Sequence, residues 1–152
     1  MLVRASTWIA VAVAFLAGST IGFSQESQSI DAELENISGQ YAECAAYYRL
    51  VYYALDESGD KETASSYREL EDNAMFYSLL LASEGRDQDL AVEVTNSRIE
   101  MYLKKMKLEA NNRNENISIL INKYHFECQE LSENPRTELA NAMQRRLQEL
   151  EE

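Results

Sequence analysis

Hydrophobic residues recur at alternating steps of four and three through the stretch Ser29–Leu55. Side chains at this spacing stack along one face of a helix. The stretch therefore predicts a long helix whose apolar side must be covered by other helices. The positions on this face are Ile30, Leu34, Ile37, Tyr41, Cys44, Tyr48, Val51 and Leu55.

Two more stretches with the helical period follow. The first runs from Asp60 to Glu84 and comes after Gly59, a residue suited to the left-handed backbone at a helix end. The second opens at Asp87 or Asp89, either of which can cap a helix, and ends near residue 110. The predicted inner face of the first consists of Ala64, Tyr67, Leu70, Ala74, Tyr77 and Leu81, widened by Met75 and Leu80. The predicted inner face of the second consists of Val92, Ile99, Tyr102 or Leu103, Met106 and Ala110.

Four asparagines crowd residues 111–116. Asparagine is a poor helix-interior residue because its side chain competes for backbone partners. Asn112 followed by Glu115 also has the spacing of a capping box. We expect a tight turn here, then a fourth helix, and a short fifth helix from Pro135 to about Leu150. The inner face of the fourth helix is predicted to hold Ile117, Leu120 or Ile121, Tyr124, Cys128 and Leu131.

These elements predict an all-α fold, an antiparallel up-down-up-down four-helix bundle with a short additional C-terminal helix. The composition agrees, since the 152 residues include five glycines and one proline and are 45% hydrophobic. Few glycines and prolines favour helices over a turn-rich β fold, and the apolar share is enough for a core.

The first residues have the pattern of a secretory signal. Arg4 precedes the uninterrupted apolar run Trp8–Ala17, and Gly22 and Ser24 are small residues suited to cleavage before Gln25. We therefore divide the chain into a signal peptide, 1–24, and a single helical-bundle domain, 25–152. The alternative is an uncleaved anchor that tethers the bundle to a membrane, although the apolar stretch is shorter than the roughly 20 residues that a spanning helix needs.

The formal net charge is −12, and every acidic residue follows the predicted signal. A negative field repels phosphate backbones and anionic lipid heads, so we expect no nucleic-acid partner and no stable membrane insertion after cleavage. The expected partner is an unknown protein or a small amphipathic ligand. We expect a monomer or a weak homodimer.

The chain has two cysteines, Cys44 and Cys128, one on the inner face of the first helix and one on that of the fourth. In an antiparallel bundle they lie roughly 16 and 20 Å from the same end, at about 1.5 Å per residue. In an exported chain this favours one intramolecular disulfide. Two free thiols or an intermolecular bridge are the alternatives.

The sequence offers little for catalysis, and we expect no enzyme, no metal site and no cofactor. The single histidine, His125, lacks the Glu-x-x-His spacing of a dimetal bundle and the Cys-x-x-Cys-His signature of covalent haem. A haem-binding four-helix electron carrier that uses His125 remains an alternative, with Met75, Met101, Met106 and Met143 as candidate axial ligands.

Nine tyrosines make up most of the aromatic residues. Tyr41, Tyr48 and Tyr52 project from one side of the first helix, and Tyr124 can face them from the fourth. One interpretation is an aromatic core, and the other is an amphipathic pocket between helices. The sequence as a whole predicts a periplasmic or secreted, disulfide-stapled helical protein that binds a ligand or partner.

Overall fold

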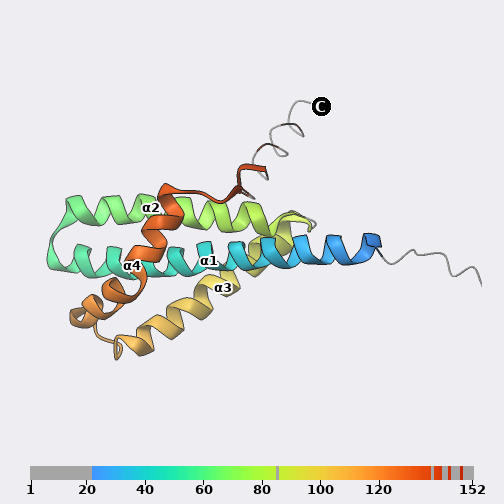
Figure 1. Ribbon diagram of the computed structural model, residues 1–152. Coiled ribbons are helices and arrows are strands. Elements are labelled where there is room, and N and C mark those ends of the chain that lie inside the picture. The colour runs from blue at the N-terminus through green and yellow to red at the C-terminus, as the bar shows by residue number, and fades with distance from the viewer. Residues whose placement is uncertain (1–21, 85, 138, 142–143, 145–147, 149–152) are drawn as a thin grey trace, which may run out of the picture.

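The computed structural model describes residues 22–84, 86–137, 139–141, 144 and 148, with side chains described from residue 32 onward. Its helices are α1 (Gly22–Ser58), α2 (Lys61–Ala82), α3 (Gln88–Glu109), the short 3-10 helix η1 (Asn114–Asn116) and α4 (Ile117–Glu133). No strand occurs in this part of the chain. The prediction of an all-α helical bundle is confirmed (Figure 1).

α1 is the axis of the fold, since α2, α3 and α4 all pack against it. It begins at Gly22, seven residues before the predicted Ser29, so the predicted cleavage site lies in its first turns. The predicted apolar face is confirmed from Leu34 to Val51, with Leu55 half-buried and Ile30 outside the described side chains. α1 also buries residues beside this face because helices surround it: Ala42, Ala45, Ala46, Tyr47 and Leu50.

The connections between helices follow the predicted local chemistry. Gly59 has a φ of 90°, and the Asp60 carboxylate accepts a hydrogen bond from the backbone N–H of Thr63 at 3.2 Å. Asp87 caps α3 in the same way by accepting from the backbone N–H of Leu90 at 2.9 Å. These side chains satisfy backbone donors that a helix leaves without partners in its first turn.

The asparagine-rich turn is confirmed, but the predicted capping box is wrong. Asn111 and Asn112 both have a φ of 54°, the left-handed region that asparagine tolerates better than most residues. This conformation removes Asn112 from the cap, and α4 begins after Asn116 without a side-chain cap. The Asn116 side chain instead donates to the carbonyl oxygen of Ala110 at 3.0 Å, so it satisfies the end of α3.

The inner face of α3 lies one position earlier than predicted at its start. Val92 is 39% exposed, whereas Ala91 is fully buried. The prediction selected the larger hydrophobic residue, but α3 packs on α1 through Ala91, Thr95, Ile99 and Met106, as four-residue and seven-residue steps require. Small side chains at the start of this face allow close approach.

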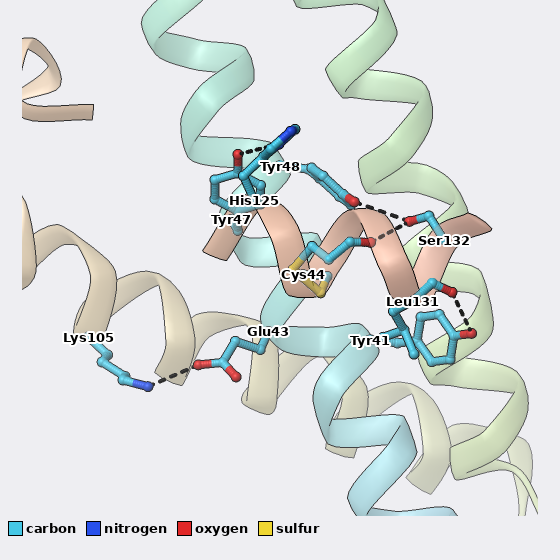
Figure 2. The surroundings of a disulfide bond; sticks show 10 residues. Tyr41, Glu43, Cys44, Tyr47, Tyr48, Lys105, His125, Leu131 and Ser132 are labelled. Carbon is cyan, nitrogen blue, oxygen red and sulfur yellow. Dashed lines mark hydrogen bonds and ion pairs between the residues drawn. A yellow bond between two sulfur atoms is a disulfide. The ribbon is translucent and has the colours of Figure 1, made fainter. Parts of the chain in front are cut away.

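α4 runs across α1, as both views show (Figures 1 and 2). Its predicted inner face is confirmed, with Leu120, Tyr124, Cys128 and Leu131 buried. Beyond α4, the backbone N–H of Ala140 donates to the carbonyl of Arg136 at 3.3 Å, and Leu139 is buried. Most of the predicted fifth helix, and the predicted signal up to residue 21, lie outside the described residues.

Candidate functional site

A disulfide joins α1 to α4 at the point where the two helices cross. Cys44 and Cys128 are both buried, their Cα atoms are 5.4 Å apart, and the predicted intramolecular bond is thereby confirmed (Figure 2). It links positions 84 residues apart in the chain. The helices that cross here therefore cannot separate without breaking a covalent bond.

Tyrosine hydroxyls reinforce the same crossing. Tyr41 donates to the carbonyl oxygen of Leu131 at 3.3 Å, and the Tyr48 hydroxyl lies 3.1 Å from the Ser132 hydroxyl (Figure 2). Ser132 in turn donates to the carbonyl of Cys128 at 2.9 Å. Each buried hydroxyl thus has the partner that it needs when removed from water.

Burial makes these tyrosines harder to ionise. Loss of hydration raises the pKa of Tyr41 to about 12, with Tyr77 contributing in the same direction. Burial also raises the pKa of Tyr47 and of Tyr48, since a phenolate would lose its hydration in the core. Tyr41, Tyr47 and Tyr48 are therefore neutral over the physiological range.

The four tyrosines predicted to line a pocket have different surroundings. Tyr41, Tyr48 and Tyr124 are buried, and Tyr52 is half-buried beneath the guanidinium of Arg68, 5.7 Å from its ring centroid. Tyr124 borders a surface hollow beside the disulfide. A ligand pocket formed by all four tyrosines stays a prediction.

Tyr47 does not belong to the predicted apolar face of α1, yet its side chain is fully buried. Its ring packs among Tyr48, Tyr67 and Tyr124, with ring centroids 5.1, 6.5 and 6.1 Å away. The position became central because α2 and α4 both cover this side of α1. A local period contains no signal for that arrangement.

The hollow beside the disulfide has a volume of about 560 Å³. α1 and α4 form its walls, and the chain after α4 closes one side. Its lining consists of Gln40, Glu43, Cys44, Tyr124, Glu127, Cys128, Glu130, Leu131, Asn134 and Arg136. Apolar surface from the disulfide, the tyrosine and the leucine thus adjoins three carboxylates and one guanidinium.

Lys105 of α3 makes the third connection at this region. Its ammonium lies 2.9 Å from a carboxylate oxygen of Glu43 (Figure 2). The same ammonium lies 5.7 Å from the ring centroid of Tyr124. The hydrogen bond to Glu43 raises the pKa of Lys105. The Lys105 side chain is still exposed to solvent, and α1 brings the Glu43 carboxylate to it.

The Glu109 carboxylate of α3 contacts the hydroxyl end of Tyr124. It accepts a hydrogen bond from the Tyr124 hydroxyl at 2.9 Å and one from the ammonium of Lys123 at 2.8 Å. Desolvation raises the pKa of Glu109, but these two hydrogen bonds outweigh it and the net pKa is lowered. The carboxylate is thus held ionised beside the buried tyrosine.

His125 is exposed, and its Nδ1 lies 3.5 Å from the Tyr47 hydroxyl (Figure 2). Met101 is exposed, Met106 is buried, Met75 is half-buried, and Met143 lies outside the described residues. Within the described ranges, no three His, Cys, Asp or Glu side chains are grouped so that they could hold a metal ion. The haem alternative stays a prediction.

Two sets of buried polar contacts between α1 and α2 were not predicted from the sequence. Glu71 of α2 is 1% exposed and accepts from Arg49 of α1 at 2.6 Å and from Arg68 at 3.1 Å. Ser38 of α1 and Ser78 of α2 each donate to the other residue's carbonyl oxygen at 2.9 Å. These pairs fix how α2 lies along α1.

Glu35 of α1 forms ion pairs with Arg86, in the connection before α3, and with Arg98 of α3. This carboxylate therefore ties α1 to α3 and to the connection that precedes α3. The contacts are charge-assisted and the three side chains are half-buried, which makes each contact stronger than a fully exposed ion pair.

Comparison with protein-family models finds no match, and neither the curated proteins nor the solved structures contain a match to this chain. Among the residues that the structure describes, no helix has the length and apolar character needed to cross a membrane.

Proposed function

We propose that the protein is an exported binding protein, periplasmic or secreted, whose hollow beside the disulfide takes a small amphipathic cation. The observation that carries the proposal is the hollow itself. Its volume of about 560 Å³ falls within the range of small-molecule sites, roughly 300–1,000 Å³. Its lining combines the apolar surface and the few charged groups that orient a ligand in such sites.

The sign of the charge supports a cationic ligand. Glu43, Glu127 and Glu130 line the hollow, and Arg136 is the single cation among the described residues of its lining. Glu43 is already paired with Lys105, so the two α4 carboxylates are the groups proposed to meet a ligand amine. The net charge of −12 adds a long-range attraction for cations.

Export is supported by the signal pattern of residues 1–24 together with the disulfide, because such bonds persist in oxidising compartments. The test is the intact mass of the chain recovered from the exported fraction, with and without reductant. We expect a chain that begins at Gln25 and gains two hydrogen masses on reduction. A full-length chain in the membrane fraction would instead support the uncleaved anchor.

The binding test compares tryptamine, an aromatic amine, with indole-3-acetate, which has the same ring and the opposite charge. Isothermal titration of the mature, oxidised protein is expected to detect tryptamine binding only. The double variant Glu127→Gln/Glu130→Gln should bind tryptamine roughly tenfold more weakly, since it removes two exposed charges without altering the core.

A matched control is Glu62→Gln/Glu69→Gln, which removes two exposed charges from α2, remote from the hollow. This variant should bind tryptamine like the unaltered protein. Equal binding of the two indoles, or equal weakening by the α2 and α4 variants, would contradict the proposed site.

A further inference from the structure

α3 has a second apolar face on the side away from α1. Leu90, Val94, Met101 and Leu108 recur with Ser97 and Lys104 at alternating steps of four and three. Leu90 is 43%, Met101 54% and Leu108 68% exposed, so no described part of the chain covers them. We call these six residues the outer seam of α3.

The outer seam has the heptad spacing by which two helices pack along each other. A shallow groove of about 280 Å³ runs along its first half, lined by Leu90, Glu93, Val94, Ser97, Arg98 and Met101. The inner face of α3 occupies the opposite side of the helix, where Ile99 and Met106 pack into the core. α3 can therefore pair through the outer seam without giving up its contact with α1.

We propose that the outer seam of α3 packs against the same seam of a second copy of this chain, with the two helices antiparallel. Charge identifies the occupant. The cap and first turns of α3 contain Asp87, Asp89 and Glu93, whereas its last turns contain three lysines, Lys104, Lys105 and Lys107, against one acidic residue, Glu109. An antiparallel copy brings acidic ends against basic ends, whereas a parallel copy would bring like charges together.

The spacing fixes the register of the pair. Leu90 packs against the partner's Leu108, Ser97 against the partner's Met101, and the stem of Lys104 over the partner's Val94. In this register Glu93 lies beside the partner's Lys107, and the two-fold axis repeats that ion pair at the other end.

Glu100 falls on the two-fold axis of this arrangement and meets the partner's Glu100. This like-charge contact weakens the dimer and is specific to the proposed register. No other register of the outer seam brings the same residue of both copies together at this position.

The contact is small. From Leu90 to Leu108 the seam is about 27 Å long, and a helix is about 10 Å wide, so the pair buries on the order of 600 Å² in total. Stable interfaces bury at least twice as much, and this dimer is accordingly transient.

Sedimentation velocity of the mature, oxidised protein over a wide concentration range tests the proposal. Glu93→Lys and Lys107→Glu should each weaken the dimer about tenfold, and the double variant should restore it, because the pair is only reversed. Glu69→Lys on α2 is the matched control, since it makes the same charge change on an exposed position outside the seam. It should leave the dimer unchanged.

Glu100→Gln should strengthen the dimer about threefold because it removes the central repulsion. All the altered side chains are exposed, and a helical spectrum identical to the unaltered protein checks that each variant folds. A single monomeric species at every concentration would overturn the proposal, as would a double variant as weak as the single ones. Co-sedimentation of a strictly monomeric protein with phosphatidylcholine vesicles would assign the outer seam to lipid instead.

Discussion

Reduction of the Cys44–Cys128 disulfide is expected to lower the free energy of unfolding by about 4.5 kcal/mol. The bond closes a loop of 84 residues, and its removal releases that loop-closure entropy to the unfolded chain. The folded state changes less, because the Tyr41 and Tyr48 hydroxyls still join α1 to α4. Since domains of this size are stable by about 5–15 kcal/mol, the reduced protein retains little margin.

Urea unfolding followed by circular dichroism measures the effect. Three samples are compared: the oxidised protein, the same protein with a phosphine reductant, and the variant Cys44→Ala/Cys128→Ala. The dependence of unfolding free energy on urea should be steeper without the disulfide, since the unfolded chain is then more expanded. The reductant should leave the double variant unchanged, which controls for its effects on the rest of the protein.

Hydrogen exchange shows which helices lose stability when the disulfide is reduced. α4 makes only sparse contact with α3 and relies on its crossing with α1, so its backbone amides should exchange faster after reduction while α1 and α2 stay protected. A loss of stability below about 1 kcal/mol, with an unchanged urea dependence, would refute the loop-closure reasoning. Uniform acceleration in all helices would refute the particular dependence of α4.

Three further perturbations test other parts of the fold. Glu71→Ala should cost about 2 kcal/mol in urea unfolding, because the Arg49 guanidinium loses its buried partner but is itself partly solvated; no loss would contradict the role of this pair. Gly59→Ala should lower the free energy of unfolding by about 1 kcal/mol, measured as a lower thermal midpoint. The cause is the φ of 90° alone, since nothing lies within 4 Å of the added methyl group. Burial raises the pKa of Tyr41 to about 12, so the protein should lose about 2–3 kcal/mol of stability as the pH rises from the ordinary tyrosine pKa of 10 through 12. Unfolding free energies measured at each pH should fall less steeply for Tyr41→Phe, and identical pH profiles for the two proteins would refute this assignment.

The features predicted correctly from sequence are those with a local cause. The apolar period from Leu34 to Val51 identifies the buried face of α1, and a left-handed glycine at Gly59 ends that helix. Asp60 and Asp87 cap the next two helices through bonds that span three residues. The caps join groups within about one helical turn, and the apolar period repeats at every turn, so both are visible in the local sequence.

The features that were missed depend on groups brought together by packing. Arg49 and Glu71 are 22 residues apart, and Lys105 and Glu43 are 62 apart, so no local pattern connects them. The choice of Val92 over Ala91 failed for a related reason, because the helix that covers α3 decides which side is inward. The crossing of α4 over α1 likewise follows from side-chain packing, although the disulfide itself was predicted.

The covalent link between α1 and α4 also changes what a protease can do to this molecule. The turns at Gly59 and at Asn111–Asn112 are exposed, and both lie inside the ring that the link closes. A single nick in either turn leaves two fragments that stay attached and migrate together until a thiol is added. The disulfide therefore keeps the two fragments together after a single cleavage.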